Sequence, residues 1–440
     1  MKRKKIWICL LVLAALTLSG CMRTVDQMYS LPRRSEEYKN LQSAVDKAMP
    51  NLEYFAPLAG ETQPAVQLAD LDGDGTDEYL LYAKGNAERP LRILIFREVG
   101  EDYIHVETIE SNGSSFDLVE YAQMDERPGL EIVIGSQLTD QVLRSVSVFT
   151  FDANMEANLL VSANYSKFLT VDLDSDNLTE LFVLRPGLSE TDRGVAELYG
   201  VENGVLERTN EVNMSEPVES LKRILTGKLH SGQTAVYVAS TVDETALITD
   251  VYACVDGKLS NVSFSNESGT SVKTMRNYYV YADDIDSDGV VELPYLIKMR
   301  PTETDTGTER HDLIRWYAMD IDGAEIDKQY TYHNFVGGWY LELDSRWADR
   351  LAVLRNGNQY EFYLWDEEFK STQKIMTIFA LAGQNRAEQG QTEERFVLYK
   401  TDTVIYSASL EQAATAYGIT QDSVTAGFKL IQQDWKTGET

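Results

Sequence analysis

Acidic side chains stand at alternate positions in the stretch ADLDGDGTDEYLLYA. Asp70, Asp72 and Asp74 take the first, third and fifth places of a loop, and Glu78 takes the ninth. Alternate residues of a turning loop can point their carboxylates inward, and calcium prefers hard oxygen ligands of this kind. Gly75 at the sixth place permits the left-handed backbone that a sharp turn requires. The pattern therefore predicts a calcium-binding loop.

The residues after this loop predict a strand. In a helix–loop–helix calcium site the closing glutamate stands at the twelfth position. Here Glu78 stands at the ninth position, and an apolar run through Tyr82 follows it directly. The ninth-position acid therefore closes the loop where a β-strand begins.

The loop recurs twice more in register, as VDLDSDNLTELFVLR and as ADDIDSDGVVELPYLIK. Clustered carboxylates repel one another unless a cation is present, so three copies favour ion binding over solvated turns. The predicted ligands are the acids at the first, third, fifth and ninth positions: Asp70, Asp72, Asp74, Glu78, Asp172, Asp174, Asp176, Glu180, Asp284, Asp286, Asp288 and Glu292.

Weaker copies lie at 123–131, 227–235 and 344–350. The first keeps Asp125 and Glu131, the second has no loop carboxylate, and the third keeps Asp344 but has Arg350 at the ninth position. Whether these loops bind ions stays open. Successive ninth positions of the six copies are 49 to 58 residues apart.

Each period contains about four short apolar or alternating runs separated by turn residues, which is typical of a propeller blade. We expect an all-β fold, a β-propeller of six four-stranded blades over 51–409. Extra candidate strands in 351–409 leave seven blades open. A strand within 64–72 is expected to close the ring. Short helices are expected over 34–49 and 410–435.

The three loops, each followed by an apolar strand, resemble the FG-GAP (VCBS-type) repeats. Those repeats build the propellers of integrin α-subunits and of many secreted bacterial proteins. The resemblance covers roughly 51–365 and implies structural calcium at the twelve acids named above. The Phe-Gly/Gly-Ala-Pro motif that names the family is not evident in this chain.

The N-terminus predicts export and lipidation. Lys2 to Lys5 precede an apolar run, and Leu-Ser-Gly-Cys then ends at Cys21. This order resembles a bacterial lipoprotein signal in which the cysteine is acylated. We expect a signal peptide over 1–20, a lipidated tether and short helix over 21–50, and a C-terminal helical segment over 410–440. The protein would then be lipid-anchored outside the cytoplasm.

Charge and cysteine content restrict the partners. The formal net charge is −30, so a nucleic-acid partner is excluded and divalent cations are favoured. Cys9 lies in the signal and Cys21 takes the lipid, which leaves Cys254 without a disulfide partner. We expect Cys254 to be a small core residue.

Motifs for catalysis are missing from the sequence. Its four histidines do not form a metal-pair spacing, and the sequence has no nucleophile elbow, phosphate loop or dinucleotide fingerprint. Aromatic residues crowd one segment, where we expect them mainly in the core, with stacking on sugars as the alternative. They are Trp316, Tyr317, Tyr330, Tyr332, Trp339, Tyr340 and Trp347.

These observations predict a non-catalytic binding or adhesion module, stabilised by calcium, that binds a protein or a glycan at the cell surface. A carbohydrate-active enzyme, such as a lyase or glycosidase on a propeller scaffold, is one alternative. A scaffold subunit of an envelope complex is another. The ligand and the oligomeric state do not follow from the sequence, because loops rather than the fold carry function.

Overall fold

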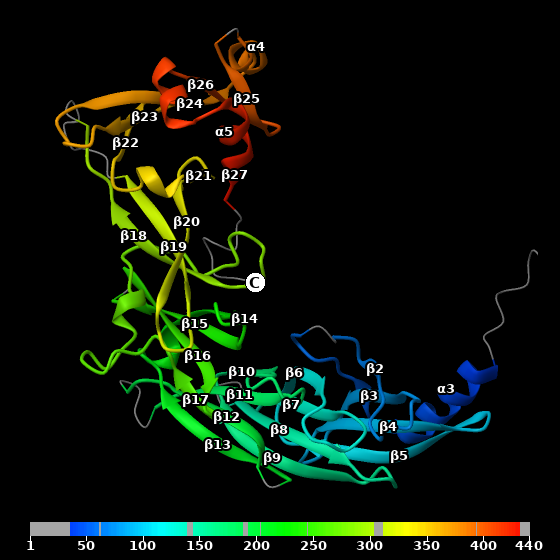
Figure 1. Cartoon of the computed structure of the whole chain (residues 1–440). Helices are drawn as coiled ribbons and strands as arrows, with labels where there is room; N and C mark the ends of the chain where they lie inside the picture. Colours follow the sequence, from blue (N-terminus) through cyan, green and yellow to red (C-terminus); the bar gives the residue numbers. More distant parts are fainter. Residues whose placement is uncertain are drawn as a thin grey trace, which may run out of the picture.

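The computed structural model describes residues 36–431, apart from 61–62, 139–143, 188–191, 203, 244, 303–310 and 393. It consists of antiparallel sheets that follow one another in chain order (Figure 1). We number them sheets 1 to 6; three have four strands and three have five. The expected all-β fold with six blades is confirmed. The signal peptide, Cys21 and the tether lie outside the described residues.

Sheets 1 to 3 occupy the first half of the described chain. Sheet 1 contains β1 (Glu53–Tyr54), β2 (Val66–Ala69), β3 (Glu78–Lys84), β4 (Leu91–Val99) and β5 (Asp102–Ser111). Sheet 2 contains β6 (Ser115–Ala122), β7 (Glu131–Gln137), β8 (Arg144–Phe151) and β9 (Ala157–Tyr165). Sheet 3 contains β10 (Lys167–Val171), β11 (Glu180–Arg185), β12 (Val195–Glu202) and β13 (Val205–Asn213).

Sheets 4 to 6 occupy the second half. Sheet 4 contains β14 (Leu221–Lys228), β15 (Thr234–Val242), β16 (Ala246–Val255) and β17 (Lys258–Asn261). Sheet 5 contains β18 (Glu292–Lys298), β19 (Asp312–Met319), β20 (Glu325–Asn334), β21 (Trp339–Leu343) and β27 (Phe428–Leu430). Sheet 6 contains β22 (Leu351–Asn356), β23 (Gln359–Trp365), β24 (Thr372–Ala382), β25 (Phe396–Lys400) and β26 (Val404–Leu410).

Short helices punctuate and flank the sheets. The α-helices are α3 (Glu36–Ala48), α4 (Arg386–Gly390) and α5 (Gln421–Gly427). The 3₁₀ turns are η1 (Val218–Ser220), η2 (Val272–Thr274), η3 (Ser345–Trp347) and η4 (Gln412–Tyr417). Between residues 36 and 431, the structure describes no helix with the length and apolar character needed to cross a bilayer.

The ninth loop position marks the start of a strand in four sheets. Glu78, Glu131, Glu180 and Glu292 are the first residues of β3, β7, β11 and β18. β3, β7 and β11 are buried along most of their length, whereas β18 is buried only over its first three residues. Sheets pack on both faces of β7 and β11, and β3 lies between sheet 2 and helix α3. An apolar run without strict alternation is the sequence form of such a strand.

Each sheet shares a hydrophobic core with the next one along the chain. Tyr82 of sheet 1 meets Phe116 of sheet 2 edge to face, with ring centroids 5.2 Å apart. Tyr332 of sheet 5 meets Phe362 of sheet 6 in the same way, at 5.2 Å. Similar clusters join sheets 2 and 3, 3 and 4, and 4 and 5. Packing between consecutive sheets therefore holds the chain together.

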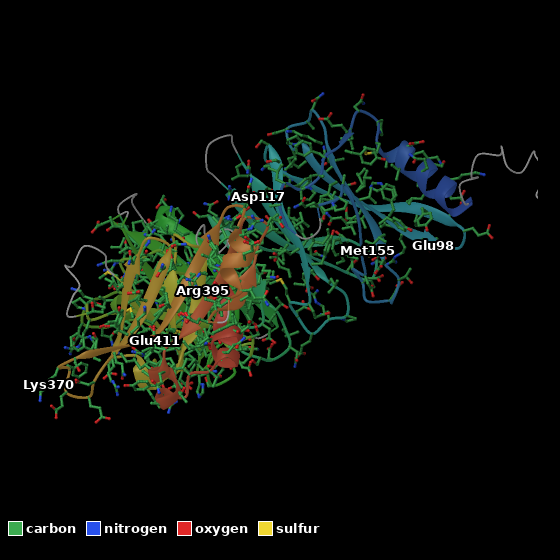
Figure 2. All side chains as sticks on the ribbon, turned by 90° about the horizontal axis from the view of Figure 1, so that it is seen from above. Glu98, Asp117, Met155, Lys370, Arg395 and Glu411 are labelled. Atoms are coloured by element: carbon green, nitrogen blue, oxygen red, sulfur yellow. The ribbon has the colours of Figure 1, made fainter. Side chains whose placement is uncertain are left out.

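Sheets 1 and 6 lie at opposite ends of a curved path (Figure 1). Seen from above, Glu98 of sheet 1 and Lys370 of sheet 6 lie at opposite ends of the molecule (Figure 2). In the part of the chain that the structure describes, no core cluster joins these two sheets. Burial is therefore carried by five successive interfaces.

The strand expected to close the ring has a different role. Within 64–72, β2 pairs antiparallel with β3, from Val66 opposite Leu81 to Ala69 opposite Glu78. The loop between the two strands is short, so β2 folds back beside β3 as in a hairpin. The prediction that this strand completes the last blade is wrong, because it completes sheet 1.

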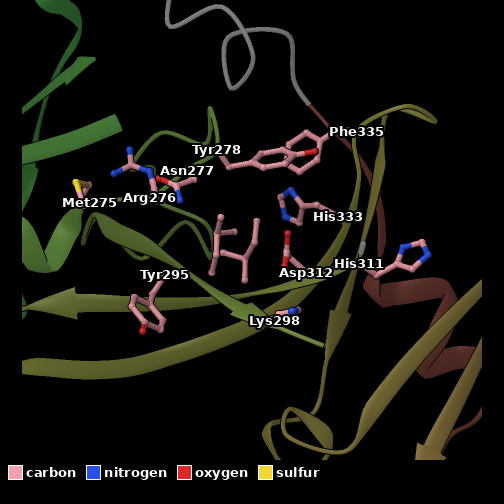
Figure 3. A pocket seen from close by; sticks show the side chains of 12 residues that line it. Met275, Arg276, Asn277, Tyr278, Tyr295, Lys298, His311, Asp312, His333 and Phe335 are labelled. Carbon is pink, nitrogen blue, oxygen red and sulfur yellow. The ribbon is translucent and has the colours of Figure 1, made fainter. Parts of the chain in front are cut away.

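Sheet 5 departs from the pattern of the first four sheets at the edge formed by β18. Asp283 forms a single bridge with Glu292, and the chain before it does not continue as a strand beside β18. An irregular segment that includes Met275 and Tyr278 lies there instead (Figure 3). At the other edge, β21 pairs with β20 and with β27.

Both predicted terminal helices form, the second only in part. Val45 of α3 packs against Leu81 and Phe96 of sheet 1, as the apolar stripe of the helix predicts. At the C-terminal end, Gly418 takes a left-handed turn with φ 73° between η4 and α5. The expected second helix ends at Gly427, because the next three residues join β21 as β27.

The loops of neighbouring sheets lock into one another. The amide of Leu130 donates to the carbonyl of Asp70 at 3.0 Å, and that of Thr179 donates to Gln123 at 2.8 Å. A Cβ added to Gly73, whose φ is 73°, would lie 2.4 Å from Pro128 Cβ. Each loop therefore also sets the spacing between two sheets.

Gly73→Ala is expected to destabilise the protein more than Gly75→Ala. Both glycines have positive φ, which costs an alanine about 1–2 kcal/mol. Only Gly73 lies against another loop, whereas a Cβ on Gly75 would meet nothing within 4 Å. The overlap should add about 1–3 kcal/mol. Urea unfolding measures the difference, and equal losses would contradict the interlocking of the loops.

Candidate metal sites

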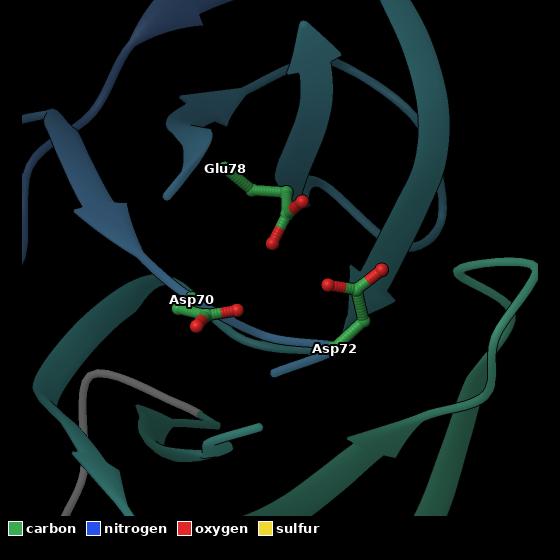
Figure 4. Close-up of side chains that lie close together, drawn as sticks. All are labelled: Asp70, Asp72 and Glu78. Atoms are coloured by element: carbon green, nitrogen blue, oxygen red, sulfur yellow. The ribbon is translucent and has the colours of Figure 1, made fainter. Parts of the chain in front are cut away.

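Three carboxylates converge in each of the three acidic loops. Asp70 and Asp72 come from the loop after β2, and Glu78 comes from the first residue of β3 (Figure 4). Within each cluster, one oxygen of every carboxylate lies within 4.8 Å of the others. The other two clusters are Asp172, Asp174 and Glu180, and Asp284, Asp286 and Glu292. Nine of the twelve predicted ligands are thus brought together in threes.

The fifth-position aspartates are outside these clusters. Asp74 Oδ1 accepts the amide of Thr76 at 2.8 Å, and Asp176 Oδ1 accepts that of Leu178 at 2.7 Å. Asp288 accepts the amide of Val290 at 2.9 Å. These carboxylates tighten the turn two residues onward, as aspartate commonly does. Their part in holding an ion stays a prediction.

The first-position aspartate holds the loop backbone. Both oxygens of Asp70 accept amides, from Gly73 at 2.8 Å and from Gly75 at 3.0 Å. Gly75 has φ 87°, and Asn177 at the same position in the second loop has φ 72°. The left-handed turn predicted at the sixth position is therefore confirmed. The fourth position is left-handed as well, with φ 67° at Ser175.

The ninth-position glutamate ties the start of its strand to the start of its loop. Glu78 Oε2 accepts the amide of Leu71 at 3.0 Å, and Glu180 Oε2 accepts that of Leu173 at 2.8 Å. Glu292 makes the same bond to Ile285 at 3.0 Å. A buried carboxylate needs such donors to offset its desolvation. We call this bond the glutamate clamp.

Burial and neighbouring carboxylates disfavour the charged form of these glutamates. Burial, together with Asp74 and Asp70, raises the pKa of Glu78 to about 6. Burial and the three aspartates of its loop raise the pKa of Glu180 to about 7. Burial and Asp286 raise the pKa of Glu292 to about 7. A cation among the oxygens would reverse this penalty, because it favours ionised carboxylates.

Two of the three clusters contain a basic side chain. The Arg97 guanidinium contacts Asp72, and its Nε lies 3.3 Å from Glu78 Oε1. Lys328 Nζ lies 2.6 Å from Asp288 and 3.9 Å from Glu292. The loop spacing did not point to either of these two residues. Both lie on strands after the loop, and only the folded sheet brings them to the acids.

The second cluster has no basic side chain against it among the described residues. Arg97 lies on β4, the second strand after the loop of sheet 1. The equivalent strand of sheet 3 is β12, which has Gly200; a Cβ added to Gly200 would lie 3.3 Å from Glu180 Cγ. Burial and the charges of Asp174 and Glu180 also raise the pKa of the half-buried Cys254 thiol. The negative charge of this loop is therefore the least neutralised of the three.

The weaker loops keep parts of the same scaffold. Glu131 Oε2 accepts the amide of Met124 at 2.8 Å, and Thr150 donates to its other oxygen at 3.0 Å. Asp125 is paired with Arg127, and Asp344 with Arg346. In the described chain these loops form no three-carboxylate cluster. The glutamate clamp is thus present in sheet 2 without the other acids.

The aromatic segment lies largely in the core, as expected. Trp316, Tyr317 and Trp339 are at most 1% exposed, and Tyr332 is 2% exposed. Trp316 Nε1 donates to Thr331 at 2.8 Å. These four residues cannot stack on a sugar. Other aromatic residues line a cavity that the sequence did not indicate.

The three acidic clusters fit a hard divalent cation. Each offers carboxylate oxygens at a short mutual distance, fixed by backbone donors and by a buried glutamate. Such donors suit calcium, magnesium or manganese, whereas zinc and copper favour nitrogen and sulphur. The clusters could therefore hold a metal ion between two strands of one sheet and beside the loop of its neighbour.

Comparison with known proteins gives no family. No protein-family model matches the chain, and no curated protein matches it. Among solved structures, the Dos1 propeller is 10% identical and covers 81% of each chain, with a TM-score of 0.30. A Lactobacillus plantarum protein is 12% identical over 73% of this chain and 86% of its own, with a TM-score of 0.26. The rhamnogalacturonan lyase YesW is 13% identical over 73% and 72%, with a TM-score of 0.27. Such low scores carry no argument about function.

Without metal, the protein is expected to lose stability as the pH rises from 5 to 8. A carboxyl whose folded-state pKa is raised stabilises the fold fully below its unfolded pKa, and that contribution is lost as the pH rises through the folded value. For Glu78, Glu180 and Glu292 this window runs from about 4.5 to about 7. Thermal unfolding in EDTA across this range measures the loss.

Glu180→Gln should flatten this pH dependence, because the amide cannot ionise yet can still accept from Leu173. Glu98→Gln, at an exposed strand end, is the control and should leave the dependence unchanged. A wild-type midpoint that stays constant or rises from pH 5 to 8 in EDTA would contradict the raised pKa values.

Proposed function

We propose that this protein is a calcium-stabilised binding module of the cell envelope, lipid-anchored through Cys21. The observation that carries the proposal is the convergence of three carboxylates in each of three loops that join neighbouring strands and sheets. We further propose that these loops are FG-GAP (VCBS-type) repeats. Their spacing and their position before a strand support this assignment.

Calcium is the ion that the loops fit best. Calcium accepts six to eight oxygen ligands at flexible distances, so a loop with carboxylates, nearby carbonyls and water can satisfy it. Magnesium requires a stricter octahedral shell. The fifth-position aspartates, which now accept amides of the turn, would complete the shell together with backbone oxygens. When bound, the ion would neutralise the charge of the clustered carboxylates where the loop meets the strand.

A binding role is supported by what the acids do in this fold. The clustered acids hold loop amides and the starts of strands. His333 is buried, and burial lowers its pKa to about 3, which suits a neutral core residue more than a proton shuttle at neutral pH. The repeated scaffold therefore serves to hold loops and surfaces rigidly for a protein or glycan partner.

Calcium is expected to raise the thermal midpoint, and EDTA to lower it. A ligand at a hundredfold excess over its Kd stabilises the folded state by about 2.7 kcal/mol per site. Asp172→Asn should remove more of the calcium effect than Asp70→Asn, since Arg97 already neutralises part of the first cluster. Differential scanning calorimetry with and without calcium measures both.

Asp366→Asn is the matched control for these substitutions. Asp366 accepts the amides of Glu368, Lys370 and Ser371 in an exposed turn and belongs to no carboxylate cluster in the described chain. The Asp366→Asn substitution should lower the thermal midpoint equally with and without calcium. A midpoint that calcium and EDTA leave unchanged in the wild-type protein would refute the calcium assignment.

Replacement of Cys21 by serine is expected to release the protein from membranes, because the serine hydroxyl cannot form the thioether that carries the lipid. Fractionation of cells that express the wild-type and Cys21→Ser proteins measures this. Cys254→Ser is the control and should stay with the membrane. If the Cys21→Ser protein also stays there, the lipid anchor is disproved.

A further inference from the structure

A cavity of about 520 Å³ lies beside β18 in sheet 5 (Figure 3). It exists because the chain before Asp283 leaves the edge of β18 after one bridge. Tyr295 to Lys298 pair with β19 on one side, and in the described chain no strand pairs with their other side. Its volume lies within the range of small-molecule sites. None of the twelve predicted metal ligands lines it.

The irregular wall of the cavity is firmly anchored. Arg276 and Leu247 exchange two backbone hydrogen bonds, both 2.8 Å long. The Arg276 guanidinium donates to the Val280 carbonyl and, through Nη1, to Thr249 Oγ1 at 3.0 Å and the Thr274 carbonyl at 2.9 Å. The segment is therefore held as a fixed wall, which is what a preformed site requires.

Aromatic rings form the rim of the cavity. Tyr278 is 39% exposed and Tyr295 is 45% exposed. The Tyr278 ring lies 4.6 Å from that of Phe335, at 41°, and Phe335 lies 5.4 Å from His333. A pyranose ring has an apolar face of C–H groups and a rim of hydroxyls. Exposed tyrosines beside polar groups match both of these surfaces.

The lining is more positive than the rest of this acidic protein. Lys298 and Arg276 provide two cationic groups, against the single carboxylate of Asp312. Lys298 is exposed and makes no ion pair with any described residue. Arg276 is 4% exposed, and its described hydrogen-bond partners are all uncharged. In a chain of net charge −30, this cavity is a local site of attraction for an anion.

We propose that this cavity binds an oligosaccharide that carries carboxylate groups, such as a uronic-acid sugar. A sugar ring stacks on Tyr278, and its carboxylate is placed at Lys298. The side chains of Asn277 and Asp312 meet the hydroxyls. The inference rests on the proposed role as a binding module, and it names the class of ligand.

Isothermal titration with the full-length protein, in detergent and millimolar calcium, tests this inference. The probes are trimers of galacturonate, glucuronate and mannuronate, each beside its carboxyl-reduced counterpart. We expect at least one acid trimer to bind tenfold or more tightly than its reduced form. Lys298→Gln should remove most of that difference, and Tyr278→Ala should weaken binding about tenfold. Tyr399→Ala, a tyrosine on β25 with the same 45% exposure as Tyr295, is the control and should change nothing.

Three results would overturn the inference. Equal affinity for the acid and reduced trimers would show that the ligand's carboxylate is not recognised. Binding that Tyr278→Ala and Lys298→Gln leave unchanged would show that the ligand binds elsewhere. If no trimer binds to protein that calcium still stabilises, the sugar ligand is wrong while the calcium scaffold stands. If calcium also fails to stabilise that protein, the proposed function fails as well.

Discussion

The bond from a buried glutamate to the backbone at the start of its own loop underlies much of this structure. In the glutamate clamp, the first residue of a strand accepts the amide of the second loop residue, at 3.0 Å for Glu78 and 2.8 Å for Glu131. The carboxylate is nearly inaccessible, so the bond is made where water cannot compete. It fixes where the loop ends and where a core strand begins.

The clamp creates an electrostatic problem that the other acids increase. Each of the three full loops places two aspartates near a buried carboxylate, so charge accumulates where it is poorly solvated. The first and third loops relieve this in part with Arg97 and Lys328. The second loop has no basic side chain at this place in the described chain. In sheet 2, burial and Asp125 still raise the pKa of Glu131, although Thr150 donates a hydrogen bond to it. The same scaffold is thus neutralised to different extents in different sheets.

The cavity that could bind a ligand lies beside the irregular segment of sheet 5, away from the repeated acidic loops. In sheets 1 to 4 the strand that follows the loop pairs with a strand on each side, whereas in sheet 5 a segment held by Arg276 takes the place of one of these neighbours. The exposed edge of β18 and the tyrosines beside it follow from that replacement. Acidic loops and cavity are therefore different features, one of them repeated and the other present in a single sheet.

The sequence by itself determined the period, the strand that follows each ninth position and the left-handed turn at Gly75, because these depend on residues close together in the chain. It also placed the first, third and ninth acids of each loop, since one short loop and one strand start bring them together. The sequence-based predictions were wrong for the partner of the strand within 64–72 and for the length of the last helix. In both cases the outcome depends on which strand the segment pairs with in the folded chain. Arg97, Lys328 and the cavity beside β18 required the tertiary structure, because each depends on contacts between segments that the loop spacing does not relate.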